Sequence, residues 1–263
     1  MKDRRAASHF KPGRGAPRGG RGRADDGVIR IYGLHAAEAA LANPRRAIRK
    51  VYATPNAAQR IAAIRPDLRN IESVTPKDLD RKLGEDTVHQ GILVEAEPLP
   101  DLTLDDLPDA RLLIFLDQIT DPHNVGAILR SAAVFGADGL LMTARHSPPL
   151  QGALAKAASG GLDLVPIVQV PNLARALADA GERGFTRLGL DSGGEVALED
   201  FPVPDRLVLV LGAEDRGLRR LSGEHCDAIC ALTTFGPIAS LNVSNAAAIA
   251  LHMMAFKMRR AAV

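Results

Sequence analysis

The feature that most constrains the fold is a set of short, wholly apolar runs in the second half of the chain. Leu112–Leu116 and Leu207–Leu211 contain only aliphatic and aromatic side chains. A strand of this kind has to be covered on both faces, as the strands of parallel sheets are. More candidate strands alternate with stretches that predict helices, so we expect an α/β fold with a mostly parallel sheet between layers of helices. The further strands are expected at Gly139–Met142, Val165–Val170, Arg187–Leu190 and Ile229–Leu232, and the helices at Asn124–Phe135, Leu150–Ser159, Leu173–Gly181 and Val243–Met258.

The first half predicts a second, smaller α/β unit over residues 28–97. Short apolar runs predict its strands, and the stretches between them predict its helices. Residues 98–110 combine prolines with an acidic stretch and predict a linker, which leaves residues 111–263 for the larger unit. The strands are expected at Val28–Tyr32, Val51–Ala53, Ile71–Val74 and Ile92–Val94, and the helices at His35–Ala42, Ala57–Ile64 and Pro76–Leu83.

Residues 1–27 form a basic tail rich in arginine and glycine. The net charge of +2 conceals an asymmetry, because residues 1–23 carry eight basic side chains and one acidic side chain. With Phe10 as its single aromatic residue, the tail cannot bury enough apolar surface to fold, and we expect it to be disordered. Such a tail binds nucleic acid by neutralising phosphates, or it acts only to keep the protein in solution; the sequence leaves both interpretations open.

Three polar segments follow candidate strands, at the edge where open α/β sheets bind ligands. The first runs from Asp117 to Arg130. Within it, Pro122 favours an extended residue before it, and we expect Asn124 to cap the helix that follows. Arg130 lies under two helical turns further on, where its guanidinium is expected to reach back toward the edge of the sheet and contact a phosphate with two hydrogen bonds.

The second and third segments lie closer to the C-terminus. In Leu211–Leu218, two glycines allow the backbone to approach a ligand closely and to present its amides. The third segment runs from Gly236 to Ser244 and leads into an alanine-rich helix, which we expect Ser240 or Asn242 to cap.

Together these segments resemble the three signature motifs of the SpoU (TrmH-like) family of RNA 2′-O-ribose methyltransferases. The patterns are D-x-x-x-D-P-x-N-x-G-x-x-x-R, L-G-x-E-x-x-G-L and S-L-N-V-S, and the resemblance covers residues 111–260. Two shorter stretches, Ile31–His35 and His89–Ile92, resemble the substrate-binding domain of the same family, which is similar to a ribosomal protein of the L30e type. The combination is most similar to the branch that methylates a guanosine of 23S ribosomal RNA.

The resemblance implies a fold, a cofactor and partners. We expect a SPOUT-type methyltransferase domain whose parallel sheet ends in a trefoil knot, which is an exception to the rule that connections do not thread loops, with a small L30e-like domain before it. The implied methyl donor is S-adenosyl-L-methionine, the implied substrate is RNA, and the implied assembly is a homodimer that pairs through the knotted domain.

The resemblance also assigns residues by their positions in the motifs. The implied cofactor-binding residues are Leu211, Gly212, Leu232 and Leu241. The implied active-site residues are Asn124, Arg130, Glu214, Ser240 and Asn242. We interpret Arg130 as a phosphate anchor and a stabiliser of the developing alkoxide, and leave open that it acts as a base with help from an RNA phosphate, because the pKa of arginine lies above about 12.

Two positions depart from the pattern of this branch. Thr233-Thr234 stands where Pro-Met is usual, and Met253 lies where the last helix commonly has an acidic residue. We expect the first change to alter the cofactor loop and the second to alter the dimer face.

Several other classes of protein are disfavoured. Cys226 and Cys230 have no second cluster with which to complete a zinc site, so we expect no metal. No apolar run of about 18 residues and no signal segment are present, which favours a cytoplasmic location. An oxidoreductase of the doubly wound type is disfavoured because no G-x-G-x-x-G follows the first strand of either unit.

Two alternatives within RNA biology stay open. The substrate is transfer RNA in the first. In the second, the chain is a catalytically inactive protein that binds ribosomal RNA, although intact Asn124, Arg130, Gly212 and Asn242 argue against it.

Overall fold

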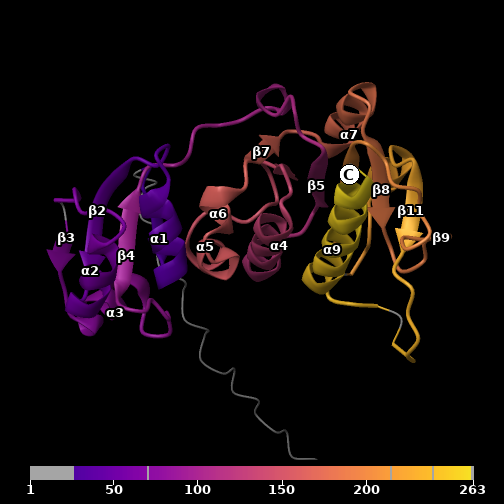
Figure 1. Cartoon of the computed structure of the whole chain (residues 1–263). Coiled ribbons are helices and arrows are strands. Elements are labelled where there is room, and N and C mark those ends of the chain that lie inside the picture. Colours follow the sequence, from indigo (N-terminus) through magenta and orange to yellow (C-terminus); the bar gives the residue numbers. More distant parts are fainter. Residues whose placement is uncertain (1–26, 70, 214, 239, 262–263) are drawn as a thin grey trace, which may run out of the picture.

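The computed structural model describes residues 27–69, 71–213, 215–238 and 240–261. The tail predicted for residues 1–27 lies outside the described residues except for Gly27, and Glu214 lies outside them as well. The two halves of the chain each form a β-sheet (Figure 1). None of the helices in the described ranges combines the length and the apolar composition needed to cross a membrane.

The N-terminal sheet has four strands in the order β1-β4-β2-β3. Strand β4 runs antiparallel to β1 and β2, and β2 runs parallel to β3. Helices α1 and α2 pack on one face of the sheet, while α3 covers the other with Leu79. The strands are β1 (Ile29–Tyr32), β2 (Ile48–Ala53), β3 (Ile71–Ser73) and β4 (Ile92–Ala96), and the helices are α1 (Leu34–Ala42), α2 (Pro55–Ala62) and α3 (Pro76–Leu83).

The C-terminal sheet has seven strands in the order β7-β6-β5-β10-β8-β11-β9, and every neighbouring pair is parallel. The predicted parallel sheet is therefore confirmed. Its strands are β5 (Leu112–Asp117), β6 (Gly139–Thr143), β7 (Ile167–Val170), β8 (Thr186–Leu190), β9 (Val196–Ala197), β10 (Leu207–Gly212) and β11 (Ala228–Ala231). Its helices are α4 (Pro122–Phe135), α5 (Gly152–Ala158), α6 (Gly161–Leu164), α7 (Leu173–Glu182), α8 (Arg220–Glu224) and α9 (Val243–Ala261).

The apolar runs bury alternate residues on the two faces of this sheet. In β5, Leu112, Ile114 and Leu116 belong to the core that includes α4 and α9. Leu113 and Phe115 point to the other face and belong to the core that includes α7. This alternation explains why a strand in the middle of the sheet contains no polar residue until its end, where Asp117 follows.

Most predicted elements are confirmed to within a few residues, and the differences have local causes. Helix α4 begins at Pro122 and is capped by Asp121, whose carboxylate accepts a hydrogen bond from the backbone N–H of His123 (2.9 Å). The prediction that Asn124 caps this helix was wrong, because proline is favoured in the first turn and puts the cap before it. Val165, predicted to begin a strand, instead ends α6.

The segment predicted as a linker has some structure of its own. Residues Leu104–Asp106 form a 3₁₀ helix, η1, which begins with a capping box between Thr103 and Asp106. Leu102 forms a single parallel bridge with Val168 of the edge strand β7. The segment is therefore attached to the C-terminal sheet before β5 begins.

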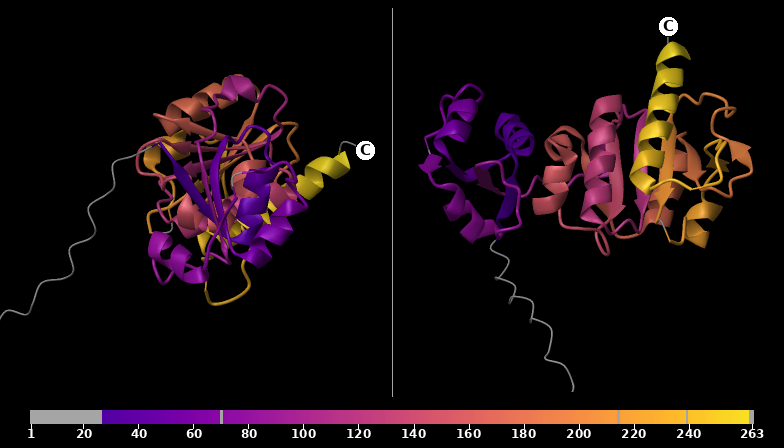
Figure 2. Two further views of the ribbon diagram at one scale, coloured as in Figure 1. Left: turned by 90° about the vertical axis from the view of Figure 1, so that its left-hand side faces the viewer. Right: turned by 90° about the horizontal axis from the view of Figure 1, so that it is seen from below.

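The two sheets are joined by a buried ion pair. The N-terminal sheet lies at one end of the molecule, next to α5 and α6 (Figure 2). Arg46 donates from Nε to Asp163 of α6 over 2.8 Å, and the two side chains are only 1% and 2% exposed. Arg46 also donates to the carbonyl of Glu97 (3.1 Å), and Asn43 donates to the Asp163 carboxylate (3.1 Å). Removing one partner would leave the other charge buried.

We expect Asp163→Ala to lower the free energy of unfolding by about 3–5 kcal/mol, because the Arg46 guanidinium would stay buried without its carboxylate. Urea unfolding followed by circular dichroism measures the change. The matched control is Arg49→Ala, which removes the ion pair between Arg49 and Glu97. Their side chains are 47% and 51% exposed, so this substitution should lower the free energy of unfolding by less than about 1 kcal/mol. Equal, small losses in both variants would contradict the prediction.

Candidate active site

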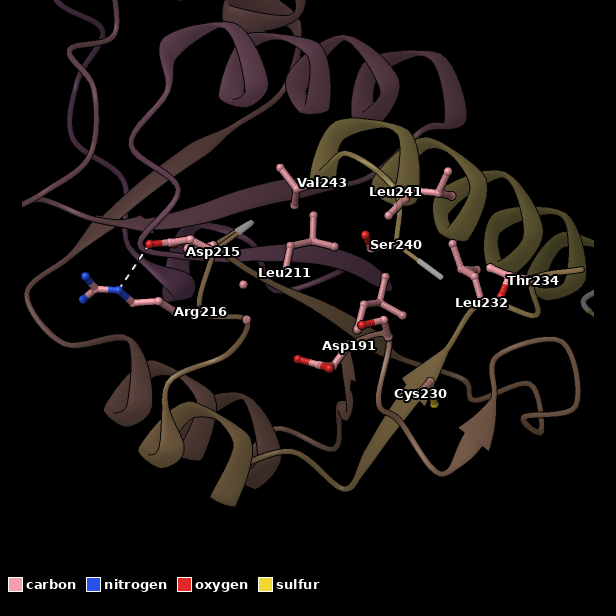
Figure 3. Close-up of a pocket in the computed structure, with 16 residues that line it drawn as sticks. Asp191, Leu211, Asp215, Arg216, Cys230, Leu232, Thr234, Ser240, Leu241 and Val243 are labelled. Carbon is pink, nitrogen blue, oxygen red and sulfur yellow. Dashed lines mark ion pairs between the residues drawn. The ribbon is translucent and has the colours of Figure 1, made fainter. Parts of the chain in front are cut away.

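A cavity of about 410 Å³ opens at the carboxyl ends of β8, β10 and β11, beside the start of α9 (Figure 3). Parallel strands bring their carboxyl ends to one edge of the sheet, so residues that directly follow three separate strands meet there. The lining residues are Leu190, Asp191, Ser192, Leu211, Gly212, Ala213, Asp215, Arg216, Gly217, Cys230, Leu232, Thr234, Ser240, Leu241, Val243 and Ala246.

All four residues that the sequence predicted for the cofactor line this cavity, and so does one predicted active-site residue. The four are Leu211, Gly212, Leu232 and Leu241, and the fifth is Ser240. They come from the end of β10, the end of β11 and the segment before α9. The structure thus brings them together, while their roles stay predictions.

The turn after β10 depends on two glycines. Ala213 and Gly217 exchange backbone hydrogen bonds of 3.1 and 2.8 Å, which close a tight turn. A Cβ on Gly212 would lie 2.2 Å from the carbonyl carbon of Gly217, well inside van der Waals contact. Gly217 has φ 62°, and a Cβ there would lie 2.4 Å from the carboxylate of Asp191. The close approach of the backbone therefore requires glycine at position 212, where the added Cβ would meet backbone atoms, and the left-handed backbone at position 217 favours glycine there.

A buried carboxylate holds the segment that follows this turn. Asp117 ends β5, and its side chain is fully buried. It accepts hydrogen bonds from Arg219, at 2.6 Å from Nε and at 3.0 Å from the backbone N–H. The sequence placed Asp117 in the first motif but predicted no role for it. A charged residue directly after an apolar strand was the available signal, since a buried carboxylate needs a partner.

The first and third motifs meet at a hydrogen bond. Asn242 donates from its side-chain amide to the side-chain oxygen of Asn124, over 3.0 Å. The side-chain oxygen of Asn242 accepts from the backbone N–H and the hydroxyl of Ser244, at 2.9 and 2.6 Å. Asn242 is therefore the residue that caps α9, which settles the choice between Ser240 and Asn242.

Arg130 lies apart from the hydrogen-bonded Asn124 and Asn242. It is exposed on α4, next to the point where Gly161 of α6 packs against the backbone of that helix. Arg130 lies six positions after Asn124, which corresponds to about 9 Å along a helix. Arg130 is not among the residues that line the cavity. Glu214, the remaining predicted site residue, lies outside the described residues.

Asp191 and the pair Asp215–Arg216 were missed from the sequence. Asp191 follows β8 and accepts a hydrogen bond from the backbone N–H of Gly193 (2.9 Å), while Arg216 and Asp215 form an ion pair of 3.2 Å at the cavity (Figure 3). The rule that singled out the other segments, a polar residue directly after an apolar strand, also applies to Asp191.

The two cysteines are neutral thiols. Cys230 is buried on β11 and lines the cavity. Burial raises the pKa of the Cys226 thiol to about 12, although the positive charge of Arg187 opposes this, and burial raises the pKa of Cys230 too. Because the thiolate is the reactive form, neither residue is a good nucleophile near neutral pH. In the part of the chain that the structure describes, no three side chains are grouped as metal ligands.

Two family descriptions match the chain, one in each half. Residues 111–252 match the SpoU rRNA Methylase family, and residues 30–102 match the family described as RNA 2′-O ribose methyltransferase substrate binding.

Among named relatives, the 23S rRNA (guanosine-2′-O-)-methyltransferase RlmB of Salmonella typhimurium is 34% identical over 234 residues, which cover 84% of this chain and 95% of the relative. An uncharacterized tRNA/rRNA methyltransferase of Mycobacterium avium is 38% identical over 188 residues, or 69% of this chain. The chain spans 60% of the length of that relative.

Solved structures share the fold. The SpoU methyltransferase AviRb from Streptomyces viridochromogenes, in complex with the cofactor AdoMet, superposes with a TM-score of 0.75 at 24% identity, and the match covers 88% of this chain and 90% of that one. An rRNA methyltransferase from Sinorhizobium meliloti, bound to AdoMet, superposes with a TM-score of 0.74 at 22% identity over 90% of this chain and 88% of that one.

Proposed function

Because the chain belongs to the SpoU rRNA Methylase family, we propose that it transfers a methyl group from S-adenosyl-L-methionine to a ribose 2′-hydroxyl of RNA. The observation that carries the proposal is that the second and third motif segments line one cavity, while the Asn124–Asn242 hydrogen bond joins the first motif to the third. We infer that the substrate is a guanosine of 23S ribosomal RNA, which is the substrate named for the relative that aligns over 95% of its length.

The cavity suits the methyl donor in size and chemistry. Its volume of about 410 Å³ lies within the range of about 300–1,000 Å³ that is typical of small-molecule sites. Leu211, Leu232 and Leu241 offer apolar contacts to an adenine ring, and Gly212 allows the backbone to approach the ring closely. S-adenosyl-L-methionine is a substrate of the proposed reaction, and its positively charged sulfonium sulfur carries the methyl group that is transferred.

The transfer forms one bond and breaks another. The 2′-oxygen of the ribose bonds to the methyl carbon as the carbon–sulfur bond breaks. The bonding pair stays on sulfur in the second product, S-adenosylhomocysteine, and the hydroxyl proton passes to water. A ribose hydroxyl is a weak nucleophile, so much of the rate comes from holding the two substrates in line and from stabilising the developing alkoxide.

We assign these tasks to residues of the motifs. Asn124 and Asn242 orient the acceptor beside the cavity, where their mutual hydrogen bond holds both side chains. Arg130 binds a phosphate of the RNA and stabilises the alkoxide, because it is an exposed cation on the same helix as Asn124. Glu214 and Ser240 complete the proposed active site.

The same proposal assigns parts of the chain. Residues 28–97 bind the RNA substrate, and residues 111–263 carry out the methyl transfer. Residues 98–110 connect these two parts, and residues 1–27 add charge-based affinity for RNA. The proposal includes a trefoil knot in the C-terminal part, a homodimer that pairs through it, and a cytoplasmic location.

We expect purified protein to transfer tritium from labelled S-adenosyl-L-methionine to 23S ribosomal RNA that lacks native methylation, and digestion to release the label as 2′-O-methylguanosine. Bulk transfer RNA without native methylation is the parallel substrate, and label found there instead would change the target. No label in either RNA, with donor binding intact, would favour an inactive RNA-binding protein and overturn the proposed activity.

We expect Arg130→Ala to lower kcat by at least about 100-fold, the cost typical of losing one charge-stabilising donor. Affinity for S-adenosylhomocysteine should be unchanged, since Arg130 does not line the cavity. Arg175→Ala is the matched control, because Arg175 is an exposed arginine on α7, against the opposite face of the sheet. Near-normal methylation by Arg130→Ala would remove Arg130 from the mechanism.

We expect S-adenosylhomocysteine at about 100 times its Kd to stabilise the folded protein by about 2.7 kcal/mol, and a nicotinamide dinucleotide to have no effect. Gly212→Ala should abolish this stabilisation, because its Cβ would lie 2.2 Å from Gly217. The control is Gly223→Ala, where the added Cβ meets no atom within 4 Å. Melting curves with and without S-adenosylhomocysteine measure the stabilisation of both variants. Full stabilisation of Gly212→Ala would place the donor elsewhere.

A further inference from the structure

Residues 233–238 and 240–241, which we call the strap, lie between β11 and α9 and carry exposed apolar side chains. Phe235 is 96% exposed, Ile238 is 76% exposed and Leu241 is 47% exposed. Among the large hydrophobic residues in the described ranges, Phe235 is the most exposed. Single exposed hydrophobic residues are common, but three within seven positions of one loop indicate a surface that binds something.

Both ends of the strap are held in place. At its start, the backbone N–H of Thr233 donates to the Glu199 carboxylate over 3.0 Å, and Lys257 of α9 donates to the backbone carbonyl of Glu199. Burial opposes ionisation of Glu199, but hydrogen bonds from the backbone and Thr233, and the charge of Lys257, bring its pKa below the ordinary value. At the other end, Asn242 caps α9.

Three residues of the strap line the cavity, namely Thr234, Ser240 and Leu241 (Figure 3), and Phe235 directly follows the first of them. In the proposed reaction the target ribose has to approach the mouth of the cavity, because its 2′-oxygen must line up with the methyl group. The base attached to that ribose then lies next to the strap.

A nucleotide brought to a pocket in this way loses the stacking of its neighbours in the RNA. Proteins replace that stacking with aromatic side chains, which accept the flat face of any base. The chain has few aromatic residues, with seven Phe, two Tyr and no Trp. Phe235, which is 96% exposed and directly follows the cavity-lining Thr234, provides such a face.

We propose that Phe235 is the platform on which the base of the target nucleotide stacks, an inference that rests on the proposed function. Phe235 thereby contributes to RNA affinity and not to donor binding. A different use of the strap, contact with a second copy of the chain, is separated by the experiment below.

The test compares Phe235→Ala, Phe235→Leu and Phe235→Trp in tritium transfer to unmethylated 23S ribosomal RNA. We expect Phe235→Ala to raise the KM for RNA about tenfold, within the range measured for the loss of one stacked base. Phe235→Trp should keep the KM near wild type, whereas Phe235→Leu, which is apolar but not flat, should not. Affinity for S-adenosylhomocysteine should be the same in all three.

The matched control is Val203→Ala, which truncates an exposed apolar residue just before β10, at the opposite edge of the sheet from the cavity. An unchanged KM in Phe235→Ala, or full recovery in Phe235→Leu, overturns the proposal. A change of oligomeric state in Phe235→Ala, measured by sedimentation velocity, overturns it in favour of contact between copies.

Filter binding of the same RNA in the presence of S-adenosylhomocysteine separates this proposal from the proposed activity. If the wild-type protein transfers no label, the activity fails, but the stacking proposal still requires Phe235→Ala to bind the RNA about tenfold more weakly. Equal RNA binding by wild type and Phe235→Ala overturns it.

Discussion

The pairing of β10 with β5 is the constraint on which the rest of the C-terminal half depends. The two strands pair in parallel from Leu207 opposite Leu112 to Gly212 opposite Asp117. Because both are buried on both faces, the polar chain that follows them emerges at one edge of the sheet. The register also puts Asp117, a carboxylate that cannot stay buried without a partner, level with Gly212, where the turn begins. Arg219 supplies that partner and holds the far side of the turn against β5.

The sequence predicted the elements of this arrangement where the pattern is local. Wholly apolar runs predicted the central strands, and glycine, proline and asparagine predicted the turns between them. The short elements were missed, namely α6, α8, β9 and η1, because two to five residues carry too little periodicity to indicate a helix or a strand. The cap of α4 was assigned wrongly because Asp121 and Asn124 are both good capping residues, and only the position of Pro122 in the first turn separates them.

Contacts between distant parts of the chain could not be predicted from the sequence. Asn124 and Asn242 were each singled out, but their hydrogen bond joins residues 118 positions apart. Nothing in the local pattern around Arg46 indicates that it is buried against Asp163. The departure at Thr233 is also explained only in three dimensions. Proline, which is usual there in the similar branch, has no N–H and could not donate to Glu199, whereas threonine does so at 3.0 Å.

In the proposed site, the two substrates are bound by different parts of the chain. The difference follows from the size and shape of the two substrates. A small donor of fixed shape is suited by a cavity of buried strand ends and tight glycine turns, where the backbone packs so closely that a Cβ on Gly212 has no room. An RNA is large and has to be deformed to present one ribose, so its contacts belong on exposed side chains outside the cavity. Arg130 on α4 and Phe235 on the strap are such side chains, and the Asn124–Asn242 hydrogen bond joins α4 to the residue that follows the strap. A phosphate held from α4 and a base held from the strap would fix the ribose between them, so that the affinity of each contact is used to orient the 2′-hydroxyl.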